Sequence, residues 1–235
     1  MTGGHGYKTP SMNIKAITLD VGGTLIEPWP SVGHVYAEVA AQHGVNVDPA
    51  VLNQQFVAAW HAGREFDYSR EAWAGLVDEV FAGLSSELPS QTFFAELYER
   101  FAEADTWRMF EDVRPALACL KERGMRMAVL SNWDERLRSL LDRLELTRLF
   151  EEIFVSAEME LTKPDGRLFD AVAERMGVEG SAILHVGDSR REDLKGALSA
   201  GWQGRLLCRD GNQHPIREGQ IVTSLRELAE ITKGP

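Results

Sequence analysis

Four short segments of the sequence carry polar side chains that could act together on one charged substrate. They supply three carboxylates, a small hydroxyl, a carboxamide and one ammonium: Asp20, Ser131, Asn132, Lys163, Asp188 and Asp193. Carboxylates suit a hard cation, and an ammonium with a hydroxyl suits a phosphate. Each segment alone is compatible with an ordinary turn or helix cap. Their occurrence together, in order along the chain, indicates a functional site.

These segments follow short apolar runs that predict buried strands. The strands are expected over residues 14–20, 127–130, 153–155, 182–186 and 205–207. Helical spacing separates them, with one helix opened by Pro115 and others over residues 135–144, 167–176, 192–200 and 225–231. This alternation predicts right-handed β-α-β units on a parallel sheet. Because ligands bind at the carboxyl ends of such strands, we expect the polar side chains to meet there.

Residues 31–110 follow a different pattern, in which apolar residues recur at helical spacing. Helices are expected over residues 36–41, 52–60, 73–81 and 93–101. The predicted fold class is therefore α/β, with a Rossmann-like parallel-sheet core of residues 12–30 and 111–235 and an inserted all-helical cap of residues 31–110. We expect the tryptophans of the insertion to form its core: Trp60, Trp73 and Trp107.

The composition narrows the classes of partner. Of the 235 residues, 44% are hydrophobic and 26% are charged, which excludes a disordered or fibrous chain. The 36 acidic and 25 basic residues give a net charge of −11, which argues against nucleic acid because that partner requires a basic face. No apolar stretch approaches the roughly 18 residues of a membrane span. We expect a small-molecule partner, and no pattern in the sequence predicts an oligomeric state.

The cysteines and the N-terminal residues point to a cytoplasmic protein. Cys119 and Cys208 are far apart and have no metal-type neighbours, so we expect two reduced thiols. Residues 1–11 are rich in glycine and lack the charged and apolar regions of a signal peptide. We expect them to be a disordered leader.

The four polar segments together resemble the four motifs of the haloacid dehalogenase-like hydrolase superfamily, with a helical cap inserted after the first. The resemblance extends from Ile14 to the C-terminus. It implies that Asp20 is a nucleophile and that Mg²⁺ is held by Asp20, the backbone carbonyl of Gly22 and Asp188, with Asp193 assisting. It further implies phosphate binding by four residues, of which Ser131 and Lys163 also serve catalysis: Thr24, Ser131, Asn132 and Lys163.

The chemistry of the residues agrees with these roles. A carboxylate such as Asp20 can attack phosphorus only when the repulsion between two anions is cancelled, which a divalent ion and a lysine would do. The substrate implied is a small phosphate ester. The sequence therefore favours a Mg²⁺-dependent phosphatase that works through an aspartyl-phosphate on Asp20.

One position departs from the pattern of the family's phosphatases. They carry a second Asp two residues after the nucleophile, where this chain has Gly22. General acid–base catalysis is typically worth about 10²–10⁴-fold in rate, so a glycine predicts slow turnover, a good leaving group or a substitute acid. His34, near the start of the insertion, is the first candidate for that acid. Trp133, directly after Asn132, is a candidate wall of the site.

Other chemistries of the superfamily remain alternatives. Phosphonate-cleaving relatives form a Schiff base with a cap lysine, whereas residues 31–110 of this chain contain no lysine. Metal-free 2-haloacid dehalogenases also have a non-acidic residue at the position of Gly22. Without a cation, however, Asp188 would repel a haloacid carboxylate and tend to share a proton with Asp20. A catalytically weak protein that binds phosphate or a partner is the third possibility.

Overall fold

The computed structural model of the chain describes residues 13–62, 66–209 and 219–232. Its centre is a six-stranded sheet with the order β5-β4-β1-β6-β7-β8, in which every neighbouring pair is parallel. The strands are β1 (Ala16–Leu19), β4 (Arg126–Ser131), β5 (Glu152–Val155), β6 (Ile183–Gly187), β7 (Gln203–Leu207) and β8 (Ile221–Val222). Leu19 is aligned with Val129 of β4 and with Val186 of β6. The carboxyl ends of these three strands therefore emerge side by side.

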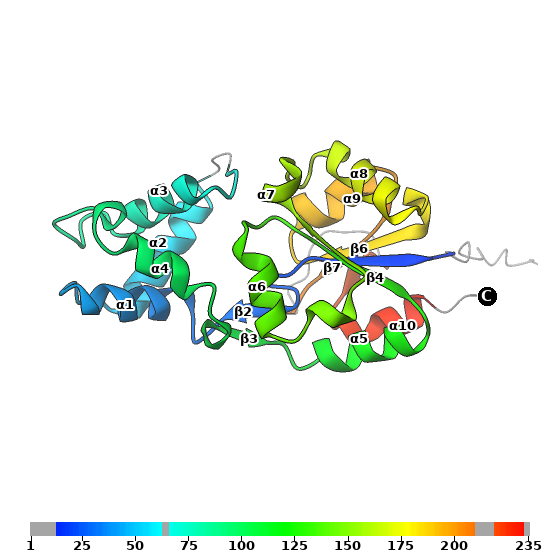
Figure 1. The fold of residues 1–235 in the computed structure, drawn as a ribbon, viewed down its shortest axis with the longest axis horizontal. Helices are drawn as coiled ribbons and strands as arrows, with labels where there is room; N and C mark the ends of the chain where they lie inside the picture. Colours follow the sequence, from blue (N-terminus) through cyan, green and yellow to red (C-terminus); the bar gives the residue numbers. More distant parts are fainter. Residues whose placement is uncertain (1–12, 63–65, 210–218, 233–235) are drawn as a thin grey trace, which may run out of the picture.

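Helices cover both faces of the sheet (Figure 1). One apolar cluster joins the sheet to α5 (Val113–Glu122), α6 (Arg136–Arg143) and α10 (Leu228–Ile231). A second joins the opposite face to α8 (Gly166–Met176) and α9 (Gly196–Ser199). The expected Rossmann-like parallel-sheet core is confirmed by this arrangement.

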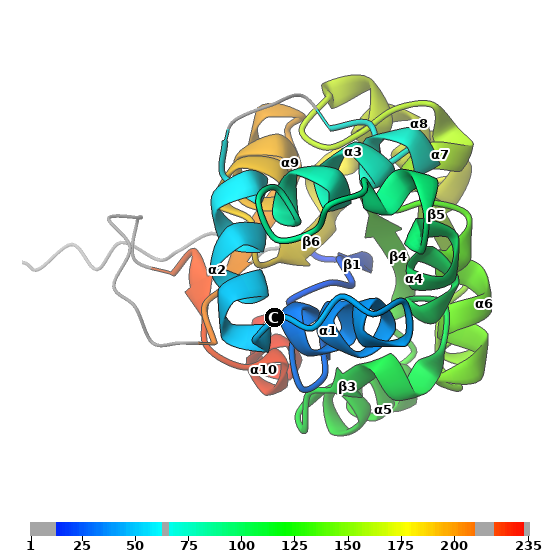
Figure 2. The same ribbon diagram turned by 90° about the vertical axis from the view of Figure 1, so that its left-hand side faces the viewer.

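Four helices stand apart from the sheet and form a second layer of their own. They are α1 (Val32–Gln42), α2 (Pro49–Trp60), α3 (Arg70–Val80) and α4 (Phe94–Arg100). Ser31, Asp48 and Ser69 cap the first three, each accepting a hydrogen bond from a backbone N–H of the first turn. Their buried faces pack on one another around residues such as Leu52 and Leu76. Viewed from the cap end, the four helices surround the region in front of the sheet (Figure 2).

A two-stranded antiparallel ribbon joins the cap to the core. It consists of β2 (Ile26–Pro28) and β3 (Trp107–Met109), so the chain enters and leaves the cap at neighbouring points. The insertion was expected to be all-helical, and β3 is a difference from that expectation. A strand of three residues shows too few alternations to be recognised in a sequence.

The remaining elements are short. They are α7 (Ser156–Met159), a π-helical turn (Arg190–Lys195) and 3₁₀ turns at Pro89–Gln91, Ala104–Thr106, Thr147–Leu149, Gly180–Ala182 and Leu225–Glu227. The helix expected over residues 192–200 is thus the π-helical turn followed by α9. The turn begins at the side chain of Ser189, which accepts a hydrogen bond from the backbone of Glu192. The helix expected over residues 225–231 is a 3₁₀ turn followed by α10.

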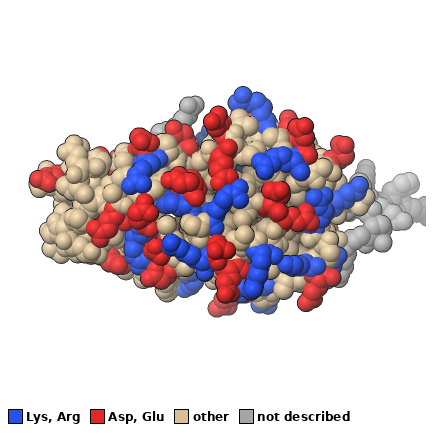
Figure 3. All heavy atoms as spheres, viewed as in Figure 1, with Lys and Arg blue, Asp and Glu red and all other residues tan. Residues whose placement is uncertain are grey.

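The surface, the helix lengths, the cysteines and the N-terminal residues add four observations. On the face shown in Figure 3, acidic and basic side chains are interspersed over the core. Within the described residues, no helix combines the length and apolarity needed to cross a membrane. Cys119 and Cys208 form no disulfide. The expected leader, residues 1–11, lies outside the described residues.

Candidate active site

Asp20 lies immediately after β1 and is the centre of the polar cluster. Its side chain is buried, and Oδ1 accepts hydrogen bonds from Ser131 Oγ at 2.9 Å and from Lys163 Nζ at 2.8 Å. Thr24 Oγ1 donates to Oδ2 at 3.4 Å. Burial raises the pKa of Asp20, Lys163 lowers it and Asp193 raises it further, with the pKa raised overall. The carboxylate therefore depends on its cationic neighbour to stay charged.

Lys163 reaches the same point from the loop after α7. Its Nζ donates to Asp20, to Asp193 Oδ1 at 2.5 Å and to the carbonyl oxygen of Leu130 at 3.1 Å. These three acceptors account for all three protons of the ammonium. Burial alone would lower the pKa of Lys163, but the carboxylates of Asp193 and Asp20 outweigh it and raise that pKa. Lys163 thus stays positively charged and forms ion pairs with Asp20 and Asp193.

Asp193 connects the cluster to the interior of the sheet. The Oδ1 atom of Asp193 also bonds His185 Nε2 at 2.9 Å, and His185 Nδ1 bonds Thr18 Oγ1 at 2.9 Å. Oδ2 accepts from the backbone N–H of Ser189 at 2.8 Å. Although burial would raise it, Lys163 and His185 hold the pKa of Asp193 below its ordinary value. Both oxygens of Asp193 therefore have protein donors, and its hydrogen bond holds the Lys163 ammonium in place.

Asp188 follows β6 and is the most exposed of three neighbouring carboxylates. Oxygen atoms of Asp20, Asp188 and Asp193 lie within 4.8 Å of one another. Burial, followed by the charges of Asp20 and Asp193, raises the pKa of Asp188 to about 8. Three carboxylates that share one ammonium leave excess negative charge. A divalent cation bound by oxygen ligands fits this donor set, with Asp20 and Asp188 best placed to hold it.

Two glycines after Asp20 allow the close approach of the neighbouring strand ends. Gly23 has a φ of +72°, and a Cβ there would come within 2.2 Å of Asp188 Oδ2. A Cβ on Gly22 would lie 3.2 Å from Cζ3 of the Trp133 indole. The indole thus occupies the space next to Gly22, where the side chain of a second Asp would begin. The positive φ belongs to Gly23, so at Gly22 the constraint comes from Trp133.

Asn132 braces the segment that carries Lys163. Its Oδ1 accepts from the backbone N–H of Lys163 at 2.8 Å, and its Nδ2 donates to the Lys163 carbonyl at 3.0 Å. Nδ2 also donates to Glu192 Oε2 at 3.2 Å. The amide is therefore already engaged, and binding of phosphate by Asn132 stays a prediction. The same holds for Thr24, which is fully buried beside Asp20.

A cavity of about 420 Å³ separates the polar cluster from the cap. Its core side includes Asp20, Ser131, Asp188 and Trp133. On the other side we define the aromatic wall as six lining residues contributed by the insertion: Phe56, Trp60, Tyr68, Trp73, Phe101 and Trp107. All three expected tryptophans line the cavity; Trp73 also packs against the cap core as expected, whereas Trp107 packs against the cluster of the sheet and Trp60 is 38% exposed. Helical periodicity marks an apolar face without showing whether that face meets protein or a cavity.

His34 lies away from this cavity. It is exposed in the first turn of α1, and its Nδ1 is hydrogen-bonded to Ser31 Oγ at 2.7 Å. His34 is not among the residues that line the cavity. The structure therefore gives no support to His34 as the substitute acid.

Comparison with known proteins identifies the chain. The sequence profile of the haloacid dehalogenase-like hydrolases matches residues 14–201. This chain belongs to that family. Haloacid dehalogenase-like hydrolase domain-containing protein 3 from Mus musculus is 32% identical over 208 residues, which cover 84% of this chain and 83% of the relative.

Two further similar proteins, one found by sequence and one by structure, are named for different activities. The phosphoglycolate phosphatase of Pseudomonas savastanoi pv. phaseolicola is 30% identical over 221 residues, which cover 91% of this haloacid dehalogenase-like hydrolase and 78% of the relative. The solved structure of a defluorinating L-2-haloacid dehalogenase has a TM-score of 0.77 at 20% identity and covers 95% of this chain and 98% of that one. At that identity the second likeness shows the fold alone.

Sequence reasoning missed the residues that close the site of this haloacid dehalogenase-like hydrolase from the cap side. Tyr68 is buried, has a φ of +63° and lines the cavity together with Asn132. It lies in a predicted break between helices, where no periodicity marks a functional side chain. Burial and the charge of Glu192 raise its pKa, so its hydroxyl stays protonated.

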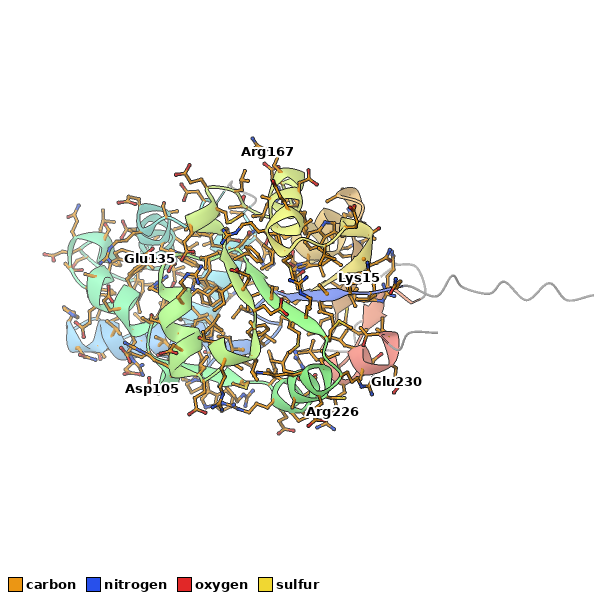
Figure 4. All side chains as sticks on the ribbon, turned by 45° about the vertical axis from the view of Figure 1, so that its right-hand side comes forward. Lys15, Asp105, Glu135, Arg167, Arg226 and Glu230 are labelled. Atoms are coloured by element: carbon orange, nitrogen blue, oxygen red, sulfur yellow. The ribbon has the colours of Figure 1, made fainter. Side chains whose placement is uncertain are left out.

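Arg136 ties the cap to the core and was also missed. Its Nε and Nη2 donate to the two oxygens of buried Asp134 at 2.7 and 2.6 Å, and its Nη1 donates to the Tyr98 carbonyl at 2.6 Å. The guanidinium carbon lies 3.4 Å from the centroid of the Tyr98 ring. Tyr98 also donates its hydroxyl to Glu135 at 3.0 Å. Glu135 lies on the cap side of the core, far from Lys15 at the start of the sheet (Figure 4).

Proposed function

We propose that this haloacid dehalogenase-like hydrolase is a Mg²⁺-dependent phosphatase that hydrolyses a small phosphate ester through Asp20. The observation that carries the proposal is the excess of negative charge at the strand ends, where the buried carboxylates of Asp20 and Asp193 share Lys163 and the exposed carboxylate of Asp188 lies within 4.8 Å of both. Such a site attracts a divalent cation, and a phosphate dianion can approach it only when the cation is present. The likeness to a phosphoglycolate phosphatase supports the same reaction class.

The residues have separate roles in the proposed reaction. An Asp20 oxygen attacks phosphorus, the bond from phosphorus to the ester oxygen breaks, and the alcohol leaves with the bonding electrons. Water then cleaves the aspartyl-phosphate, so that an ester and one water become an alcohol and inorganic phosphate. Ser131 and Lys163 hold Asp20 in place by their hydrogen bonds. When bound, Mg²⁺ would offset the charge of the phosphate and carboxylates at Asp20 and Asp188.

The glycine at position 22 shapes the expected rate. No proton donor follows the nucleophile at that position, and Trp133 fills the adjacent space. Departure of the alcohol and activation of the second water therefore lack the usual local acid and base. We expect slow turnover and a steep dependence on how well the leaving group carries negative charge.

The runner-up, a metal-free 2-haloacid dehalogenase, fits the site less well. A haloacid carboxylate would have to approach Asp20 and Asp188 without a compensating cation. Burial and, after it, repulsion from Asp20 and Asp193 raise the pKa of Asp188, so a further anion there is unfavourable. A protein that binds phosphate but turns it over poorly is the other alternative, and Gly22 is the residue in its favour.

A phosphate-release assay with Mg²⁺ or EDTA tests the proposal. We expect release from 4-nitrophenyl phosphate only with Mg²⁺, and a loss on the order of 10⁴-fold or more in Asp20→Asn. Asp188→Asn should weaken Mg²⁺ binding measured by calorimetry, whereas Asp170→Asn, an exposed carboxylate on α8, should leave it unchanged. BeF₃⁻ with Mg²⁺ should raise the melting temperature of the wild type and not of Asp20→Asn. Full activity in EDTA or in Asp20→Asn would refute the proposal.

A further inference from the structure

The cavity above Asp20 has two chemically opposite sides. Its core side carries the carboxylates, whereas the cap presents the aromatic wall. Aliphatic side chains extend the apolar side, among them Val32, Val77 and Leu97. With the proposed cation bound at the carboxylates, a ligand that fills this cavity needs an anionic end beside the cation and an apolar body beside the wall.

The wall is built from flat rings that stack on one another and line the cavity. The Trp60 and Trp73 rings are stacked with centroids 5.8 Å apart and an interplanar angle of 11°, and Phe56 stacks on Trp60 at 6.0 Å and 14°. Trp60 keeps 38% of its surface exposed, although it is a large apolar side chain. Flat aromatic surfaces of this kind are matched by another flat ring, which stacks on the face or meets the edge.

The cap offers little to a second anionic group. Of the described residues that line the cavity, Arg136 is the one with a cationic side chain. Its charge is already neutralised by Asp134. Its guanidinium also donates to the Tyr98 carbonyl and lies over the Tyr98 ring. A carboxylate on the ligand would lose its hydration against the wall without gaining a free cation.

The leaving-group requirement at Gly22 points in the same direction. Without a proton donor beside the nucleophile, the ester oxygen has to depart as an anion. A phenolate spreads its negative charge over the ring and departs without protonation far more readily than an alkoxide. The apolar cavity and the missing acid therefore favour the same kind of alcohol.

We propose that the substrate is an aryl phosphate, the phosphate monoester of a flat aromatic alcohol whose ring packs against the aromatic wall. This rests on the proposed function, since the phosphate is placed at Asp20. Attack by Asp20 breaks the bond between phosphorus and the aryl oxygen, and the phenolate leaves with the electron pair and takes a proton from solvent. Water then hydrolyses the aspartyl-phosphate, so an aryl phosphate and one water become a phenol and hydrogen phosphate.

Matched substrate pairs distinguish the effect of the aromatic wall on kcat/KM from the effect of the leaving group. Benzyl phosphate and 2-phosphoglycolate both release primary alcohols, but only the second carries a carboxylate. Phenyl and 2-naphthyl phosphate release phenols of similar acidity and differ in flat apolar area. We expect kcat/KM to favour benzyl phosphate over 2-phosphoglycolate by at least about 10-fold, and 2-naphthyl over phenyl phosphate by about 3- to 10-fold.

Variants of Trp60 assign this preference to the wall. Trp60→Ala should remove the preference for 2-naphthyl phosphate, mainly by raising KM. Trp60→Arg should raise the relative rate on 2-phosphoglycolate by supplying a free cation. Val57→Ala is the matched control, because Val57 is an exposed apolar residue of the same helix that does not line the cavity.

The outcomes distinguish this inference from the proposed function. If kcat/KM is equal for the two members of each pair, and Trp60→Ala changes neither ratio, the aryl phosphate proposal is overturned. The proposed phosphatase function would remain. Phosphate release from no ester in the presence of Mg²⁺ would instead refute the proposed function. In that case calorimetry with Mg²⁺ decides the ligand class, because phenylphosphonate should bind more tightly than phosphonoacetate and lose that advantage in Trp60→Ala. Equal binding of the two would overturn the inference.

Discussion

The two sides of the cavity are built in opposite ways. The polar floor, formed by Asp20, Ser131, Lys163, Asp188 and Asp193, comes from strand ends and adjoining turns and is held by short hydrogen bonds. The aromatic wall comes from the inserted helices and the segments beside them and is held by ring packing. Directional bonds fix the floor atom by atom, whereas apolar packing fixes the wall only in shape and volume. We therefore expect substitutions in the floor to be far more costly than substitutions in the wall.

The largest effect is expected from Lys163→Met, which removes the only ammonium of the floor. Asp20 and Asp193 would then face each other without a cation, and a buried charge that loses its partner typically costs about 3–5 kcal/mol in the free energy of unfolding. Turnover should fall to background as well. Urea denaturation in EDTA measures the loss, and Lys195→Met, the same change at an exposed lysine, should cost less than about 0.5 kcal/mol. A loss in Lys163→Met as small as in the control would contradict the electrostatic account of the floor.

The next effect is expected where floor and wall meet, at Gly22 and Trp133. Gly22→Asp alone should raise kcat only slightly, because its Cβ would lie 3.2 Å from the Trp133 indole. Combined with Trp133→Leu, it should raise kcat on benzyl phosphate by up to about 10²–10⁴-fold and help 4-nitrophenyl phosphate much less, because a nitrophenolate needs no proton.

Trp133→Leu alone is the control for this pair and should show no such gain. The measurement is kcat for each ester in the single and double variants. Equal gains on both esters would mean that the new carboxylate does not act as an acid.

The smallest of the three effects is expected from Gly23→Ala, compared with Gly124→Ala. Both glycines have nearly the same positive φ, +72° and +70°, but only Gly23 has a neighbour within reach of a Cβ. Each variant should lose about 1–2 kcal/mol of stability from the backbone conformation alone. Gly23→Ala should lose roughly 1–3 kcal/mol more and bind Mg²⁺ more weakly, because Asp188 must move. Indistinguishable melting curves and Mg²⁺ affinities would show that the floor can shift to accept a side chain.

Much of the floor could be predicted from the sequence, because strand ends reveal their position in a parallel sheet. Asp20, Ser131 and Asp188 follow apolar runs, and the sheet brings them together as expected. Their hydrogen-bond partners could not be predicted in the same way. The link from Asp193 to His185 and Thr18 depends on side-chain directions inside the sheet, which periodicity does not encode.

The wall was much harder to predict than the floor. Its residues follow ordinary helical spacing or lie in breaks, so Trp60 and Trp73 look like core and Tyr68 looks like loop. Whether an apolar face meets protein or a cavity depends on how the inserted helices sit over the sheet. The β2–β3 ribbon connects these inserted helices to the core. Each of its strands has only three residues, which is too short to recognise in the sequence.

That ribbon has a consequence for how such a protein can change over generations. Ile26 pairs with Met109 and Pro28 with Trp107, so the whole cap leaves and rejoins the chain across one strand spacing. The sheet therefore sees the cap as a loop closed at the ribbon, and the closure entropy of a loop grows only slowly with its length. Insertions, deletions or wholesale replacement between the two strands leave the register of the sheet untouched. If Asp20 performs the proposed reaction, we expect the reacting floor and the substrate-contacting wall to change independently of each other.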